Sequence, residues 1–336
     1  MCPDIEQLLL TLRRGQGKHI PLAELGVHPA IKEKLLKRPV LSLQDDVDFW
    51  RSAGYDYIKL QPQVDFNIPG HITDESITQS IAWAPEGQGI IGSWEDFEHF
   101  NFTKSSEIDY TVFDQIGELL PDGMGVIGQY GDIFTMTWEL MGFEGFSYAL
   151  FDNPDLVTGI FDKIGDPVFS MFEYFVQNDV VDAIWYSDDI AYITGLMMSP
   201  DILKQYFFPW LKKIGDLAHQ YDKPLIYHTD GILWDVMEDI IDCGVDALHP
   251  IEPKAMDIVE VKQKYGYQLC LIGNLDVGDV LTLGTPADVE RIVRHNIEKV
   301  GYNGGYCVGS GNSIPDYVKF ENYLKMIETV RAFNAS

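Results

Sequence analysis

Cysteine and basic residues are scarce in this 336-residue chain. Its four cysteines, Cys2, Cys243, Cys270 and Cys307, lie far apart and form no CxxC pair. The sequence therefore offers no disulfide framework and indicates a reducing compartment. The chain has 24 Lys+Arg against 52 Asp+Glu, a formal net charge of −28. We expect neither nucleic acid nor an anionic membrane as a partner, because both carry dense negative charge that this chain repels.

Long apolar runs and targeting signals are missing as well. No stretch approaches the about 18 uninterrupted apolar residues that a membrane-spanning helix needs. Residues 1–18 have no basic segment ahead of an apolar run and no cleavage signal, so they do not read as a secretory leader. We expect a cytoplasmic protein. A hydrophobic content of 46% is ample for a large core, which predicts a globular chain.

Common nucleotide-binding and hydrolytic motifs are absent too. No GxGxxG follows the first predicted strand, and the chain contains no GxxxxGK[ST], HExxH or GxSxG. These absences argue against a dinucleotide-binding fold, a P-loop, a helical zinc-protease site and a nucleophile elbow.

Short apolar strands alternate with amphipathic helices along most of the chain. This alternation is typical of parallel β/α units whose sheet is covered on both faces. We predict strands at 55–60, 124–128, 183–187, 224–228, 246–250, 268–273 and 304–309, and an eighth before residue 124. Helical segments are expected at 4–14, 105–119, 132–178, 199–220, 232–242, 256–264, 286–300 and 318–332.

The pattern predicts an α/β fold, a (β/α)8 TIM-type barrel that forms a single domain over residues 1–336. Residues 67–105 are rich in Gly, Pro, Ser and aromatic side chains. We interpret them as an irregular excursion or lid after the first strand, because a loop of that length inside a compact domain is usually functional.

Polar side chains follow five consecutive predicted strands in the second half of the chain. In barrels of this kind the chemistry lies at the carboxyl ends of the strands. For any single residue, a helix cap or a loop hydrogen bond is an equally good explanation. The whole set, however, contains more polar groups than the helices need as caps. The candidates are Asp188, Asp189, His228, Asp230, His249, Glu252, Asn274, Asp276 and Asn312.

His228 and Asp230 are candidate metal ligands. Two residues apart at a strand end, they point to the same side, and zinc accepts both imidazole nitrogen and carboxylate oxygen. Glu252 or His249 on the next strand could complete the site. The alternative is that Asp230 only orients a neutral His228 by a hydrogen bond.

Asp188 and Asp189 are candidate catalytic acids, since one carboxylate of a close pair has a raised pKa. Acids before a helix are also favoured by its dipole alone. Glu139, beside Trp138, is a third catalytic candidate if it faces the cavity; core packing is the alternative for this stretch. We assign substrate binding to Trp138, His249, Asn274, Asp276 and Asn312.

Several ordered segments resemble the uroporphyrinogen decarboxylase (URO-D) superfamily. They are SDDIAYITGLMMSPDILKQYFFPWLKKI (187–214), PLIYHTDGILWDVMEDIIDCGVDALHPIEP (224–253), GNLDVGDVLTLGTPADVERIV (273–293) and YCVGSGNSIPDYVKFENYLKMIE (306–328). The resemblance implies a (β/α)8 barrel. One branch decarboxylates a porphyrinogen without a cofactor. The other transfers a methyl group from a methylated corrinoid protein to a thiol or similar acceptor, which a zinc held by a His-x-Cys pair and a distant Cys activates.

The chain departs from both branches. Residues 12–18, LRRGQGK, do not reproduce the arginine pair of the decarboxylases. His228 matches the zinc histidine of the methyltransferases, but Asp230 and Gly311 stand where that branch has its two cysteines. The HTDG and HPIEP strings resemble the methyltransferase-related branch more. That resemblance implies zinc, methylcobalamin presented by a corrinoid protein, and a small-molecule acceptor.

Three functions follow as hypotheses. The first is a methyltransferase that moves a methyl group between a corrinoid protein and a small thiol or similar acceptor. The second is a cofactor-free decarboxylase of an acid smaller than uroporphyrinogen. The third is a non-catalytic barrel that binds a corrinoid or a partner protein. The sequence leaves a homo-oligomer open.

Overall fold

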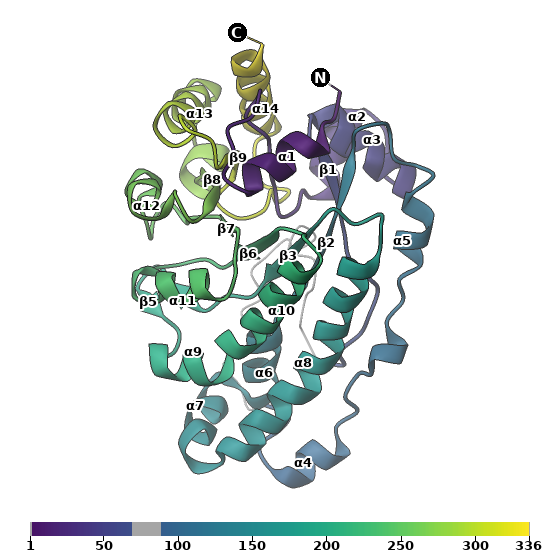
Figure 1. Ribbon diagram of the computed structural model, residues 1–336, viewed down its shortest axis with the longest axis vertical. Coiled ribbons are helices and arrows are strands. Elements are labelled where there is room, and N and C mark those ends of the chain that lie inside the picture. The colour runs from purple at the N-terminus through teal and green to yellow at the C-terminus, as the bar shows by residue number, and fades with distance from the viewer. Residues whose placement is uncertain (1, 69–88, 336) are drawn as a thin grey trace.

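A curled sheet of parallel strands forms the centre of the computed structural model, which describes residues 2–68 and 89–335. The strand order is β1-β2-β3-β6-β7-β8-β9. All seven strands fall where the sequence predicts them: β1 (Tyr57–Leu60), β2 (Gly125–Gly131), β3 (Ala183–Ser187), β6 (Leu225–His228), β7 (Ala247–His249), β8 (Cys270–Leu275) and β9 (Tyr306–Ser310). Helices lie outside the sheet (Figure 1). The predicted α/β barrel class is confirmed.

The N-terminal segment takes the place of the predicted eighth strand. Leu22 and Val27 form isolated parallel bridges, the first to Val308 within β9 and the second to Ile314 beyond the end of β9. On the other side, the Tyr57 hydroxyl in β1 donates to the Glu24 carbonyl and accepts from the Glu24 N–H, both at 2.8 Å. The segment thus lies between β9 and β1. Single bridges are not a strand, so an eighth strand of this sheet is absent from the described part of the chain.

Fourteen α-helices are described: α1 (Ile5–Leu12), α2 (Pro29–Leu36), α3 (Leu43–Ala53), α4 (Trp94–His99), α5 (Thr111–Ile116), α6 (Ile133–Met141), α7 (Phe143–Asp152), α8 (Pro154–Gln177), α9 (Pro200–Tyr206), α10 (Phe208–Gln220), α11 (Met237–Asp242), α12 (Ile258–Tyr265), α13 (Pro286–Val300) and α14 (Phe320–Asn334). Two 3-10 turns and one π-helical segment accompany them: η2 (Ser105–Glu107), η3 (Trp234–Val236) and the π-helical η4 (Val277–Thr282).

Two predicted helical stretches are divided for local reasons. Within 132–178, Gly142 has a φ of 68° and separates α6 from α7; this conformation is costly for other residues. Within 105–119, only η2 and α5 form. The backbone of Asp109 exchanges both hydrogen bonds with Gln63 at 2.9 Å, and this bridge interrupts the helical pattern.

One feature near β3 was not predicted. A short antiparallel hairpin of β4 (Ala191–Tyr192) and β5 (Gly195–Leu196) follows β3 directly. Strands of two residues carry too little alternation to be seen in a sequence.

The predicted excursion at 67–105 contains one helix in its described part. Ser93 accepts a hydrogen bond from the Asp96 N–H and begins α4. The rings of Trp94 and Phe97 in α4 lie against Gly159 in α8. Residues 69–88 of the excursion are outside the described residues. The role of the excursion as a lid, and the extent of the single domain, stay predictions.

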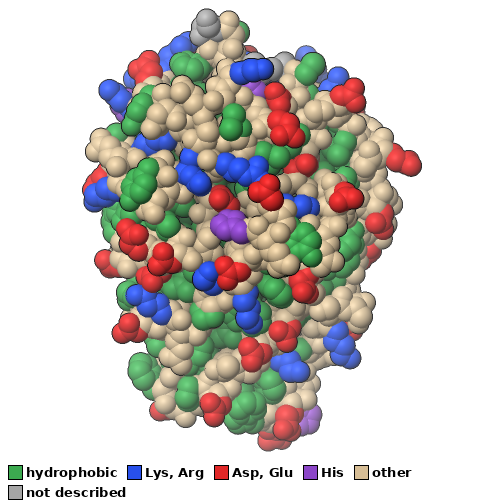
Figure 2. Space-filling model, in the orientation of Figure 1, with side chains coloured by type: hydrophobic (Ala, Val, Ile, Leu, Met, Phe, Trp, Pro, Cys, Tyr) green, Lys and Arg blue, Asp and Glu red, His purple; other side chains and the backbone are tan. Residues whose placement is uncertain are grey.

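Acidic side chains are spread over the whole viewed surface, and basic ones are interspersed among them (Figure 2). This distribution accords with the net charge of −28. Among the described residues, no helix combines the length and the apolar character that crossing a membrane requires.

Candidate functional site

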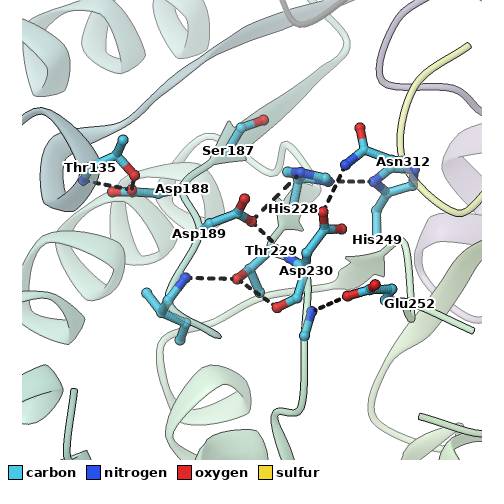
Figure 3. Close-up of polar contacts among 12 residues, drawn as sticks. Thr135, Ser187, Asp188, Asp189, His228, Thr229, Asp230, His249, Glu252 and Asn312 are labelled. Carbon is cyan, nitrogen blue, oxygen red and sulfur yellow. Dashed lines mark hydrogen bonds and ion pairs between the residues drawn. The ribbon is translucent and has the colours of Figure 1, made fainter. Parts of the chain in front are cut away.

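The carboxyl ends of β3, β6 and β7 meet side by side. In the sheet register, Ser187 is opposite His228, and His228 is opposite His249. Alternate residues of a strand face the same side, so Asp189 and Asp230 extend from this row toward the end of the barrel. Figure 3 shows Asp189, His228 and Asp230 pointing toward one another, with His249 beside His228 on the side away from Asp189.

His228 and His249 form a buried imidazole pair. Their Nδ1 atoms lie 2.7 Å apart, and their side chains are 1% and 0% exposed. Burial lowers the pKa of His228 to about 3, with a contribution from the positive charge of Lys59. Burial, and then His228, lowers the pKa of His249 well below its usual value. Both rings are therefore neutral, and the contact requires one Nδ1 to donate and the other to accept.

The outer nitrogen of each ring is unsatisfied. His228 Nε2 and His249 Nε2 are buried and have no hydrogen-bond partner among the described residues. The carboxylate oxygen Oδ1 of Asp189 lies 3.9 Å from His228 Nε2, beyond hydrogen-bonding distance. Buried polar atoms are almost always satisfied. His228 Nε2 is thus a candidate metal ligand, since the other nitrogen of the same ring, Nδ1, is already held by His249.

Asp189, His228 and Asp230 together form a candidate metal centre. One ligand atom from each lies within 4.8 Å of the other two. The Asp230 N–H donates to Asp189 Oδ1 at 2.8 Å, and Asn312 Nδ2 donates to Asp230 Oδ2 at 2.7 Å. One imidazole and two carboxylates fit a catalytic zinc site, which has three protein ligands and one open position.

Asp189, predicted from the sequence as a catalytic acid, is the third member of this group, while the predicted role of Glu252 as a ligand stays a prediction. Burial raises the pKa of Asp189 to about 6, although the Asp230 N–H lowers it. Its side chain remains 40% exposed, so the carboxyl is surrounded by protein on one side and open on the other. Glu252 instead accepts the Gly231 N–H at 2.9 Å, and burial raises its pKa.

Asp188 points away from this group (Figure 3). Its carboxylate accepts from the N–H of Phe134, the N–H and hydroxyl of Thr135, and the Tyr186 hydroxyl, at 2.7 to 3.0 Å. Burial raises the pKa of Asp188 to about 7 against these donors, which lower it. Asp188 thus anchors the start of α6. Its catalytic role stays a prediction that this placement does not favour.

The other predicted residues fall into two groups. His249 and Asn312 contact the metal candidates directly. Asn274 instead donates to the Ile251 carbonyl and accepts from Asn296. Asp276 lies 3.7 Å from Lys254 Nζ in an ion pair that joins the β7 and β8 loops.

Trp138 and Glu139 lie together on α6. The Trp138 ring packs edge-on against Phe143, with centroids 5.8 Å apart. Both Trp138 and Glu139 are half-buried. Their roles in substrate binding and catalysis stay predictions.

A polar layer across the barrel was not predicted from the sequence. Lys59 Nζ lies 3.5 Å from Gln129 Oε1, Gln61 also donates to Gln129, and Gln129 Nε2 donates to Ser187 Oγ at 3.0 Å. The register places Lys59, Gln129 and Ser187 on the same face of the sheet as His228. A lysine inside the apolar run YDYIKL was the signal that could have revealed this layer.

Comparison with known proteins agrees with this arrangement. The family model of uroporphyrinogen decarboxylase (URO-D) matches residues 88–333, most of the chain. The chain belongs to the URO-D family.

This URO-D chain is similar to the methylcobamide:CoM methyltransferase MtbA of Methanosarcina mazei. The two are 26% identical over 222 residues, which are 66% of this chain and 60% of that relative. The match thus spans less than two thirds of the relative's length. Together with the family match, it supports the methyltransferase-related branch that the sequence predicted.

A solved methyltransferase from Methanosarcina mazei has the same fold. It matches with a TM-score of 0.69 over 97% of this chain and 98% of that chain. The sequence identity is 16%, so this likeness bears on the fold alone.

Proposed function

We propose that this URO-D family member is a cytoplasmic methyltransferase. It transfers a methyl group between methylcobalamin on a corrinoid protein and a small thiol or similar acceptor. The observation that carries the proposal is the buried, unsatisfied His228 Nε2 beside Asp189 and Asp230. The similarity to a methylcobamide-dependent methyltransferase supports the reaction class.

Zinc is the metal that this donor set favours, with His228, Asp189 and Asp230 as its ligands. Bound zinc would act as a Lewis acid that lowers the pKa of an acceptor thiol. A ligating histidine normally donates its other N–H to a fixed partner. In this chain that partner is His249 Nδ1, at 2.7 Å.

Glu252 is our candidate acceptor for the proton that the thiol loses. It is half-buried beside Asp189, and burial raises its pKa, which makes it a stronger base than an exposed carboxylate. The Gly231 N–H holds the Glu252 carboxylate at 2.9 Å. Thiol binding, proton removal and the reacting methyl group would thus meet at the carboxyl ends of β6 and β7.

Methyl transfer is tested with the purified full-length protein, zinc, methylcobalamin and a panel of thiols. We expect loss of methylcobalamin absorbance together with a methyl thioether product. His228→Ala should abolish this reaction. His99→Ala should retain it, because His99 lies in α4 and contacts the Glu95 carbonyl. No transfer to any thiol, or equal transfer by His228→Ala, would contradict the proposal.

A decarboxylase is the second candidate, and the raised pKa of Asp189, about 6, is the observation in its favour. In this reaction the C–C bond to the carboxylate breaks, CO₂ leaves, and the carbon takes a proton from Asp189. Release of CO₂ from a small acid that continues under a strong chelator, and stops in Asp189→Asn, would favour this function over methyl transfer.

A further inference from the structure

A buried glutamate interrupts the pairing between the N-terminal segment and β9. The Ala23 N–H donates to the Val308 carbonyl at 2.9 Å, and the Ile314 N–H donates to the Gly26 carbonyl at 2.9 Å. Between these two contacts, the Ser310 N–H donates to a side chain instead. Its acceptor is Glu24 Oε1, at 2.8 Å.

Glu24 holds Ser310 with both carboxyl oxygens. In addition to the N–H contact, Ser310 Oγ lies 2.6 Å from Glu24 Oε2. Both side chains are 0% exposed. The Tyr57 hydroxyl fixes the backbone of Glu24 on the opposite side. A carboxyl in this position costs desolvation free energy, which requires an explanation beyond packing.

The contacts continue from Ser310 into the candidate metal centre. Ser310 Oγ lies 2.9 Å from the Asn312 carbonyl and 3.4 Å from the Asn312 N–H. The Ser313 N–H donates to Asn312 Oδ1 at 2.7 Å, which turns the amide so that Nδ2 donates to Asp230 Oδ2. One path of hydrogen bonds, through the side chains of Glu24 and Ser310 and then the backbone and amide of Asn312, thus joins the N-terminal segment to Asp230.

We infer that Glu24 is a positioning residue of this site: through Ser310 it holds Asn312 against Asp230 and so orients one carboxylate of the metal centre. The consequence for metal binding rests on the proposed function. The placement of Asn312 by Glu24 does not, because it concerns contacts within the chain alone.

The hydroxyl of Ser310 has a single proton, which makes the inference specific. With Glu24 ionised, Ser310 donates to Oε2. With Glu24 protonated, Glu24 donates to Ser310 Oγ, and the Ser310 proton can go to the Asn312 carbonyl. Burial raises the pKa of Glu24 to about 8, so the protonated form is accessible near neutral pH. A glutamine at position 24 has the same donor and acceptor pattern as that form.

The test compares the full-length wild type with Glu24→Leu, Glu24→Gln and Ser310→Ala. Asp56→Asn is the matched control. Asp56 is also buried and also anchors the N-terminal segment, through the Asp4 N–H and His19, but it has no contact with Ser310 or Asn312 among the described residues. The first measurement is hydrogen exchange in a peptide that spans residues 306–316. The second is the Kd for Zn²⁺ by calorimetry.

We expect exchange at 310–314 to rise about 10- to 100-fold in Glu24→Leu and Ser310→Ala, the range that leaving a buried polar group without its partner gives. Glu24→Gln and Asp56→Asn should stay near wild type. The Zn²⁺ Kd should weaken about 10- to 100-fold in Glu24→Leu, as for other outer residues of metal sites, and recover in Glu24→Gln.

Unchanged exchange in both Glu24→Leu and Ser310→Ala would overturn the inference. So would an equal rise in Asp56→Asn, because that result means general loosening of the N-terminal segment. Ser310→Ala decides the question if Glu24→Leu does not fold. A wild type that binds no Zn²⁺ would count against the proposed function alone, since the exchange measurement needs no metal.

Discussion

His228 and His249 face each other through the same ring nitrogen, Nδ1, across 2.7 Å. Because both rings are buried and neutral, the proton position of one sets that of the other. A proton on His228 Nδ1 leaves His228 Nε2 with a free lone pair on the side of Asp189 and Asp230. With His249 Nδ1 as the acceptor, the pair thus holds His228 in the form that can bind a metal.

Replacing His249 should therefore weaken zinc binding without removing a ligand. His249→Phe removes the acceptor for His228 Nδ1, and we expect about a 10- to 100-fold weaker Kd for Zn²⁺. His249→Gln, which restores an acceptor, should recover part of that loss. Calorimetry of both variants checks this, with His219→Ala on the exposed end of α10 as the control. Equal Zn²⁺ affinities for His249→Phe and the wild type would mean that His249 only packs against His228 and does not assist metal binding.

Replacing Asp188 should lower the free energy of unfolding and leave the affinity for zinc unchanged. Asp188→Asn keeps one acceptor oxygen for the start of α6 and loses the other, and one hydrogen bond to a charged group is worth about 1.5–3 kcal/mol. We expect the free energy of unfolding to fall by about 1–3 kcal/mol and the Zn²⁺ Kd to stay within about twofold. Urea unfolding and calorimetry test the two halves. If Asp188→Asn lost much of its zinc affinity at unchanged stability, Asp188 would have a direct role at the metal site.

Two glycines should respond in opposite ways to alanine. A Cβ at Gly309 in β9 would lie 2.0 Å from the Ala23 carbonyl oxygen, so Gly309→Ala must displace the N-terminal segment. We expect about 1–3 kcal/mol of destabilisation, as for other overpacked sites. At Gly145 in α7 nothing lies within 4 Å, and Gly145→Ala should gain about 0.5–1 kcal/mol from helix propensity. Thermal unfolding of both variants decides it; no loss in Gly309→Ala would contradict the described closure of the barrel.

Glu24 should make stability depend on pH. Its pKa is raised from 4.5 to about 8 in the folded chain, so the folded state binds the proton more tightly than the unfolded state. The stabilisation of the folded state that this tighter proton binding gives is complete below pH 4.5 and is lost as the pH rises toward 8. Relative to Glu24→Gln, the wild type should lose free energy of unfolding from pH 5 to about 8. Urea unfolding across this range measures the difference; parallel curves for the two proteins would contradict the raised pKa.

The strands were predictable because their signal is local. Runs such as AIWYS and PLIYH are apolar, aromatic and short, and each ends in a polar group. Barrel topology then places those groups at one end. The prediction of His228 and Asp230 as neighbours depended only on their spacing of two residues.

Contacts between segments that are distant in the chain could not be predicted from the sequence. Whether Asp188 or Asp189 faces His228 depends on which of them the start of α6 binds, 53 residues earlier in the chain. The Glu24–Ser310 contact spans 286 residues, and nothing in the local pattern of either segment indicates it. Glu252 was predicted as a ligand from its strand; one of its carboxylate oxygens accepts the Gly231 N–H, and its role as a ligand stays a prediction.

Metal binding by Asp189, His228 and Asp230 underlies the proposed function. Elemental analysis of zinc in the full-length protein, purified without chelator, tests it most directly alongside Asp189→Asn, His228→Ala and Glu252→Gln. We predict near-stoichiometric zinc in the wild type and in Glu252→Gln, and loss of zinc in the other two variants. No zinc in the wild type after incubation with the metal, or zinc that is lost only in Glu252→Gln, would contradict the account.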